Sequence, residues 1–154
     1  MIYRVEVEDM LALADIRRSI HDDHASSRPL SAGYEEIGVA GELAFEDWSG
    51  CPMDRTVRPA GDTCDFTIAG HTIDVKTARK AYNLIIEEGR VDQDIYVLAQ
   101  FETPDGIRFL GWHWGVVMAK QPVRTFGHGI RNHFMAAAEL RTMADLREGL
   151  EPNG

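Results

Sequence analysis

The stretch from Gly61 to Lys80 constrains the fold more than any other part of the sequence. Two short runs of alternating apolar and polar residues, Cys64 to Ile68 and Thr72 to Thr77, are separated by the dipeptide Ala69-Gly70. Alternation has the two-residue period of a strand, and a short break containing glycine between two such runs is typical of a tight turn. The stretch therefore predicts a β-hairpin.

A two-residue loop fixes which residues of this hairpin face each other. It places Ile68 opposite His71, and counting outward places Asp65 opposite Asp74. Because successive strand residues point to opposite sides, Asp65, Asp74 and Lys76 are expected to share one face. The other face would carry apolar side chains, namely Phe66, Ile68, Ile73 and Val75. We expect the apolar face to join the core. The charged face gathers groups that are seldom buried unless they are paired or bound to a metal.

Two carboxylates on adjacent strands suggest a site for a hard divalent cation. Asp65 and Asp74 would repel each other unless a cation lay between them. Mg²⁺ takes oxygen ligands of this kind, commonly one or two carboxylates together with substrate phosphate. The hairpin is therefore a candidate site for phosphodiester hydrolysis. The alternative is an exposed hairpin with a solvated Asp and Lys face, because an acid two residues before a lysine is by itself a weak motif.

The pattern Asp65, eight residues, then Asp74-Val75-Lys76 resembles the PD-(D/E)xK nuclease superfamily, in which the motif lies on such a hairpin. The upstream segment Gly38 to Phe45 resembles the family's first helix, which carries a glutamate, here Glu42. More weakly, Ile95 to Phe101 and Ile107 to Trp112 resemble its later strands. One departure is Cys64, which stands where the family often has proline.

The resemblance implies a restriction-endonuclease-like α/β fold over residues 1–154, with a central mixed sheet of four or five strands flanked by helices in an αβββαβ-type core. It implies Mg²⁺-dependent hydrolysis of DNA, with Mn²⁺ able to substitute. Asp65, Asp74 and the Val75 carbonyl would hold the metal, and Glu42 would complete the site directly or through water. Lys76 would orient or deprotonate the attacking water and stabilise negative charge. Exonuclease, junction resolvase, nickase and restriction-type endonuclease all remain open.

Several cationic or polar residues are candidates for contacting the DNA backbone. Thr77, Arg79 and Lys80 follow the motif directly. The segment Gln121 to His133 looks irregular and contains Arg124, His128 and Arg131 among glycines. It is either a phosphate-contacting loop or an ordinary connector.

The net charge of −9 is unusual for a protein that binds nucleic acid, because phosphate binding favours a basic surface. It argues against tight, sequence-independent coating of DNA. It is compatible with a locally basic surface, a homodimer or a partner protein that brings the DNA. A rival interpretation is a catalytically silent module that binds nucleic acid or protein. A third is an acidic protein that competes with DNA for a basic partner.

The rest of the chain reads as alternating helices and strands. We expect a strand at Ile2 to Val7 and then a helix, a loop at His21 to Ser31, and a second helix at Tyr34 to Trp48. In that second helix, Gly38 and Gly41 would allow close approach to the hairpin and place Glu42 beside it. The alternative is that Glu42 is one of several surface acids. Further strands are expected at Arg55 to Arg58, Leu84 to Ile86, Ile95 to Phe101 and Ile107 to Trp114, with a closing helix from Phe134.

Two cysteines without a CxxC pair, Cys51 and Cys64, fit reduced thiols. We find no secretory signal at the N-terminus and no apolar run long enough to span a membrane, so we expect a cytoplasmic protein without a membrane partner.

Overall fold

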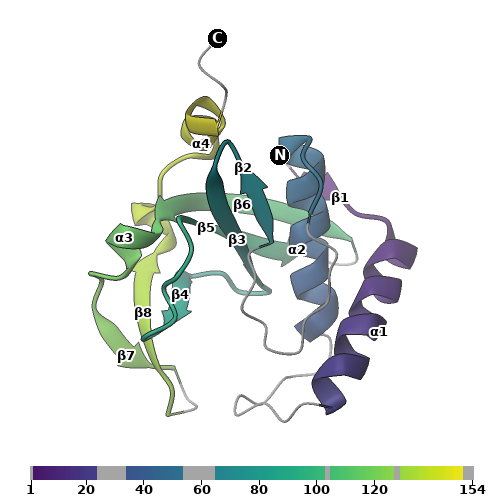
Figure 1. Cartoon of the computed structure of the whole chain (residues 1–154), viewed down its shortest axis with the longest axis horizontal. Coiled ribbons are helices and arrows are strands. Elements are labelled where there is room, and N and C mark those ends of the chain that lie inside the picture. The colour runs from purple at the N-terminus through teal and green to yellow at the C-terminus, as the bar shows by residue number, and fades with distance from the viewer. Residues whose placement is uncertain (1, 24–33, 54–64, 103–104, 127–128, 151–154) are drawn as a thin grey trace.

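A mixed five-stranded sheet forms the centre of the computed structural model, which describes residues 2–23, 34–53, 65–102, 105–126 and 129–150 (Figure 1). Its strand order is β1-β6-β5-β3-β2. The strands are β1 (Ile2–Arg4), β6 (Gly106–Trp114), β5 (Ile95–Glu102), β3 (His71–Ala78) and β2 (Phe66–Ile68). Only β3 and β5 run parallel, and the other neighbours are antiparallel. The expected mixed α/β architecture with a sheet of this size is confirmed.

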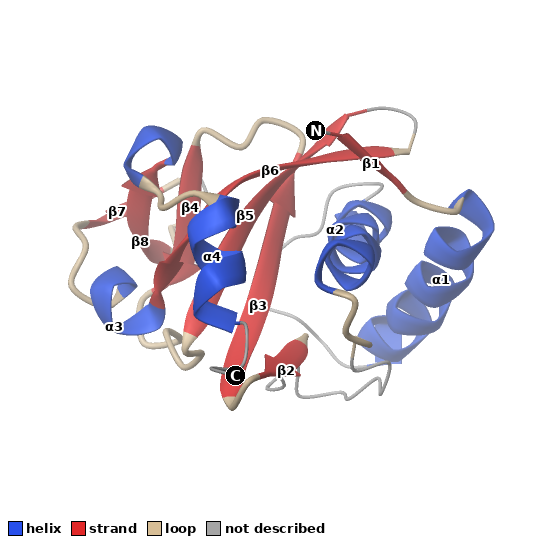
Figure 2. Ribbon diagram, turned by 90° about the horizontal axis from the view of Figure 1, so that it is seen from above, coloured by secondary structure: helices blue, strands red, loops and turns tan. Residues whose placement is uncertain are grey.

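Two helices lie in successive layers on one side of this sheet. Helix α2 (Tyr34–Ser49) lies on β3 and β5, and α1 (Val7–Asp23) packs against α2 on the side away from the sheet (Figure 2). The core between them contains Phe45, Phe66 and Val97 among its most deeply buried side chains. Helix α1 begins at Val7, so the strand expected to reach Val7 ends at Arg4, and the helix continues through the first residues of the expected loop.

The hairpin forms in the predicted register. Phe66 lies opposite Ile73, and Ile68 lies opposite His71. The two loop residues, Ala69 and Gly70, have φ angles of 52° and 80°. A turn with positive φ at both central positions matches the right-handed twist of the flanking strands. The two-residue loop therefore sets the register in which β2 and β3 pair.

A second sheet, which the sequence patterns did not reveal, follows the hairpin. It contains β4 (Asn83–Glu87), β8 (Arg131–Ala136) and β7 (Val123–Thr125) in the order β4-β8-β7, all antiparallel. The interpretation of residues 121–133 as irregular is therefore wrong. A helix from Phe134 is wrong as well: the strand continues to Ala136, a 3-10 helix η1 (Ala137–Glu139) follows, and α4 spans Met143–Leu150.

Packing against β4 overrides the helix propensity of the alanine-rich segment. Met135 lies opposite Leu84, and both are buried in a second core with Tyr96, Leu98 and Met118. Met118 ends the short helix α3 (Gly115–Met118), which follows β6 directly. Intrinsic propensity spans less than about 1 kcal/mol per residue apart from proline, so burial of this kind outweighs it. The small sheet thus covers the side of β5 that faces away from α2.

Some expectations fall outside the described residues. These are the strand at Arg55 to Arg58, Cys64, His128 and most of the loop expected before Ser31. In the part of the chain that is described, no helix is long and apolar enough to cross a membrane.

Candidate active site

Asp65 immediately precedes strand β2, which begins at Phe66. Its backbone N–H donates to the Ile73 carbonyl over 3.1 Å, and its side-chain Oδ2 accepts a hydrogen bond from the Val75 N–H over 2.8 Å. The pairing of Asp65 with Asp74 expected from the hairpin count is not formed, since β2 begins only at Phe66. The carboxylate instead takes the place of a strand partner for β3. This bond fixes one carboxylate oxygen at the edge of the strand that carries Asp74.

Glu42 reaches the same point from helix α2. Its side chain is 6% exposed, which is unusual for a glutamate. The helix comes close to β3 at Gly41, where a Cβ atom would collide with the hydroxyl oxygen of Thr77. The absence of a side chain at position 41 therefore lets the helix backbone rest on Thr77. Glu42, the next residue, is then held beside the end of β2.

The pKa of Asp65 reports how closely the acids are gathered. Burial raises the pKa of this carboxyl well above its ordinary value, and the negative charges of Asp74 and Glu42 raise it further. Hydrogen bonding with the Glu42 and Asp74 side chains acts in the same direction, because it favours the protonated acid. The structure thus brings Glu42, Asp65 and Asp74 together from three different elements: α2, the start of the hairpin and β3.

Lys76 supplies the positive charge of the cluster. Its Nζ lies 2.6 Å from Oδ2 of Asp74, two residues earlier on the same side of β3. The Lys76 side chain is 45% exposed and the Asp74 side chain 15%. The ammonium therefore lies on the solvent side of the acids, where it can reach a molecule that approaches them from solution.

The acids offer oxygen atoms only, which is the donor set that Mg²⁺ prefers. As the side chains are placed, no three His, Cys, Asp or Glu residues among those described are arranged as a ready ligand set. Two oxygens are already engaged, one of Asp74 by Lys76 and one of Asp65 by the Val75 N–H. The donor chemistry suits a hard divalent ion.

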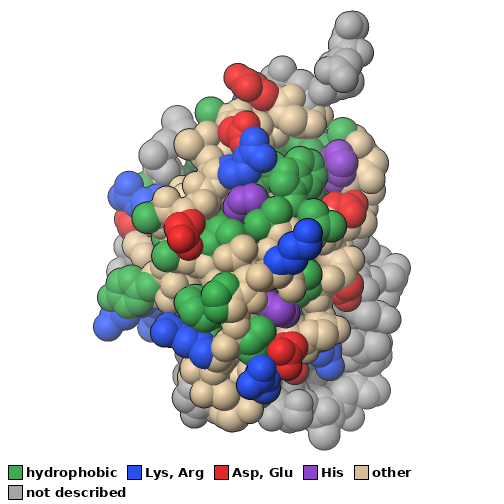
Figure 3. Space-filling view, turned by 90° about the vertical axis from the view of Figure 1, so that its left-hand side faces the viewer, with side chains coloured by type: hydrophobic (Ala, Val, Ile, Leu, Met, Phe, Trp, Pro, Cys, Tyr) green, Lys and Arg blue, Asp and Glu red, His purple; other side chains and the backbone are tan. Residues whose placement is uncertain are grey.

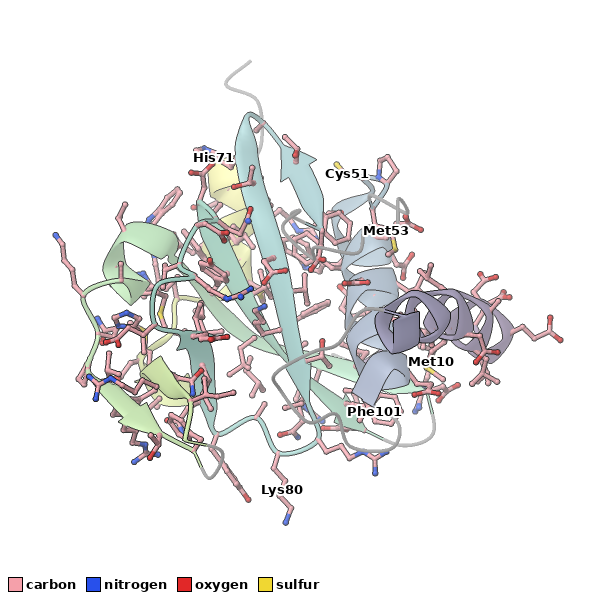
Figure 4. The ribbon with its side chains drawn as sticks, turned by 60° about the horizontal axis from the view of Figure 1, so that its bottom comes forward. Met10, Cys51, Met53, His71, Lys80 and Phe101 are labelled. Atoms are coloured by element: carbon pink, nitrogen blue, oxygen red, sulfur yellow. The ribbon has the colours of Figure 1, made fainter. Side chains whose placement is uncertain are left out.

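The remaining sequence-predicted residues lie in different settings. Thr77 is half-buried, and its hydroxyl faces Gly41 without a hydrogen-bond partner in the described part of the chain. Arg79 and Lys80 are exposed just past the end of β3. In Figure 4, β3 starts at His71 by the hairpin turn, and Lys80, two residues past its end, points away from the molecule. Arg124 and Arg131 lie on the small sheet rather than with the carboxylates.

Two contacts that build the site were not visible to sequence reasoning. The hydrogen bond from the Val75 N–H to Asp65 depends on where β2 begins, and the contact between Thr77 and Gly41 depends on how α2 packs on β3. The Gly41-Glu42 pair was the sequence signal for the contact between Gly41 and Thr77, because it suggested close approach of the helix to the hairpin.

Comparisons of this chain with family models, with curated proteins and with solved structures find no match.

Proposed function

We propose that the chain is a Mg²⁺-dependent nuclease that hydrolyses phosphodiester bonds in DNA, with its residues in the restriction-endonuclease-like, PD-(D/E)xK arrangement. The observation that carries the proposal is the gathering of Glu42 and Asp74 around the buried Asp65, with Lys76 held on Asp74. Three acids at one point disfavour the folded state unless they share protons or bind a cation. A function that uses a cation gives this arrangement a physical reason.

Each residue has a role in this proposal. Glu42, Asp65 and Asp74, with the Val75 carbonyl, would hold the ion. When bound, Mg²⁺ supplies Lewis acidity toward the phosphate and lowers the pKa of a bound water. Lys76 would stabilise the negative charge that develops on the phosphate and orient the attacking water. The Val75 N–H keeps Asp65 at the edge of β3, and Gly41 keeps Glu42 within reach of it.

A second candidate is a catalytically silent binding module on the same scaffold. The direct ion pair between Lys76 and Asp74 favours it, because that pair neutralises two of the groups that catalysis would use. A silent module would bind nucleic acid or protein with no dependence on divalent metal. The two functions therefore differ in whether divalent metal makes the protein cleave DNA, which can be measured on one sample.

The deciding experiment incubates the purified chain with supercoiled plasmid and with linear DNA in Mg²⁺, in Mn²⁺ and in chelator. We expect cleavage with either metal and none with chelator. Asp74→Ala and Lys76→Ala should each lower the rate at least about 10²-fold, as the loss of one transition-state donor does in other enzymes. Lys120→Ala, which removes an exposed lysine in the turn after α3, serves as the matched control and should cleave normally. Undiminished cleavage by both site variants would place the site elsewhere, and no cleavage by the wild type would favour the silent module.

A further inference from the structure

The small sheet has an outer face that carries aromatic and polar side chains. In the register of this sheet, Phe134 lies opposite Ile85, and Asn132 lies between Arg124 and Glu87, so these five residues share one face. The Glu87 carboxylate is paired with Arg90. The other face carries Leu84, Ile86 and Met135, which are buried in the second core. We call the first of these the outer face. Figure 3 shows the side of the molecule that carries α3, β7 and β8, where hydrophobic side chains lie between basic ones.

Arg124 lies against two phenyl rings at this face. Its guanidinium carbon is 4.4 Å from the ring centre of Phe126 and 4.6 Å from that of Phe134. The two rings are 5.8 Å apart and inclined at 74°. The contacts restrain the guanidinium without using any of its N–H groups. Within the described residues it makes no hydrogen bond and no ion pair, whereas five other arginines pair with carboxylates: Arg4, Arg90, Arg108, Arg131 and Arg141.

Asn132 adds a buried polar group to the same face. It is 5% exposed, and its amide nitrogen donates to the Ile130 carbonyl over 2.9 Å. Its amide oxygen is buried and has no hydrogen-bond partner in the part of the chain that the structure describes. Since most buried side-chain oxygens are hydrogen-bonded, an unmet acceptor beside an unpaired guanidinium indicates a ligand that carries both an anion and N–H donors.

We propose that the outer face of the small sheet binds an unpaired stretch of nucleic acid, in a site formed by Arg124, Phe126, Phe134 and Asn132. The guanidinium would take a phosphate through its N–H fork, and a base would stack on the phenyl rings. A base amino group could donate to the amide oxygen of Asn132, which lies opposite Arg124 in the sheet. The choice of nucleic acid as ligand rests on the proposed function and names its substrate as DNA with exposed bases.

The charge of the chain favours single strands over duplex or an acidic peptide. With a net charge of −9, this protein has little general attraction for a polyanion. Stacking supplies affinity that does not depend on charge, but it requires bases that are not already stacked in a duplex. A peptide of acidic residues could pair with Arg124, and its backbone N–H groups could donate to Asn132, but it offers no planar base to stack on the phenyl rings.

The test is fluorescence anisotropy of a labelled 20-nucleotide single strand and of the matching duplex, in chelator so that no cleavage occurs. The wild type should bind the single strand about tenfold tighter than the duplex. Phe134→Ala and Arg124→Gln should each weaken binding about tenfold, and Arg124→Gln should also reduce the slope of log K against log salt by about 0.7. Arg124→Lys keeps the charge but loses the planar fork, so its affinity for the single strand should lie between that of the wild type and that of Arg124→Gln. Arg108→Ala is the charge-matched control on β6 and should bind as the wild type does.

Arg124→Gln changes an exposed side chain, so it remains informative if Phe134→Ala fails to fold. Any one of three results would overturn the inference. They are equal binding by the wild type and Arg124→Gln, a preference for the duplex, and tight binding of polyglutamate with no binding of the single strand. Single-strand binding that is lost in Arg124→Gln, without cleavage in Mg²⁺, would support this site and contradict the nuclease proposal. Normal cleavage in Mg²⁺ together with unchanged single-strand binding by Arg124→Gln would contradict this site and support the nuclease proposal.

Discussion

Asp65 shows how one side chain can replace a strand partner and join a cluster of acidic side chains at the same time. Its Oδ2 accepts a hydrogen bond from the Val75 N–H, so the edge of β3 keeps a hydrogen bond beyond the first residue of β2. The spacing of the hairpin was enough to predict that Asp65 and Asp74 come close. It could not predict that the Asp65 side chain, rather than its backbone, bonds to the Val75 N–H. Aspartate side chains compete with backbone groups for hydrogen bonds wherever a strand pairing ends.

The raised pKa of Asp65 gives a prediction about pH and stability. In the unfolded chain this carboxyl ionises near its ordinary pKa of about 3.9, whereas in the folded protein it resists ionisation. Folding is therefore penalised as the pH rises from the ordinary value toward the raised one, and the penalty is absent below both. Asp65→Asn should melt at a higher temperature than the wild type at pH 7 in chelator, and the difference should shrink toward pH 4. Each kcal/mol gained should appear as about 2–4 °C.

The control for this prediction is Glu139→Gln, which removes an exposed acid from η1. It should leave the melting temperature within about 1 °C of the wild type at every pH. If Asp65→Asn were less stable than the wild type at pH 7, its ionised carboxylate would be contributing favourably to the fold, and the gathering of acids would have another origin.

At the scale of elements, helix α2 places Glu42 through one of its two internal glycines. The sequence suggested that Gly38 and Gly41 both serve close approach. The structure separates them: a Cβ at position 38 would meet nothing within 4 Å, whereas one at position 41 would run into Thr77. Periodicity could place the helix and its apolar face, but it could not tell which glycine touches the sheet.

This difference predicts opposite effects for two alanine substitutions in the same helix. Gly38→Ala should stabilise the protein by up to about 1 kcal/mol, because alanine is the better helix former. Gly41→Ala should destabilise it by about 1–3 kcal/mol, because the helix must move off β3. Moving the helix also displaces Glu42, so Gly41→Ala should weaken Mn²⁺ binding while Gly38→Ala leaves it unchanged. Urea unfolding and calorimetric titration measure the two effects.

Thr77→Ala in the Gly41→Ala background should partly restore stability, since it removes the hydroxyl that the new methyl group meets. A Gly41→Ala protein as stable as Gly38→Ala would contradict the close contact between α2 and β3.

The hairpin and the small sheet mark the limits of local prediction. The hairpin register follows from a two-residue loop, so counting from Ala69-Gly70 was sufficient to pair Phe66 with Ile73. The small sheet pairs β4 with β8, which lies more than forty residues further along the chain. Nothing local in the segment around Phe134 reveals that partner, and its alanines favour a helix when considered alone. The strand forms because Met135 reaches the second core.

At the scale of the whole molecule, two separate hydrophobic cores support the two proposed sites. The core under α2 holds the carboxylates of the candidate site in place, and the second core supports the sheet that carries Arg124. In the proposed function, both parts bear on the net charge of −9. A bound cation offsets the acids of the candidate site, and stacking offers affinity for nucleic acid that does not depend on a basic surface.

The central claim is that the acids around Asp65 form a metal site, and the melting temperature with and without millimolar Mn²⁺ tests it most directly. A cation that binds only the folded protein adds about 2.7 kcal/mol at 100 times its dissociation constant, or several degrees for a chain of this length. We predict such a rise for the wild type and for Glu139→Gln. Asp74→Asn should melt higher than the wild type in chelator and lose most of the rise. A wild-type curve that Mn²⁺ leaves unmoved, together with an Asp74→Asn protein that is simply less stable, would contradict the metal site.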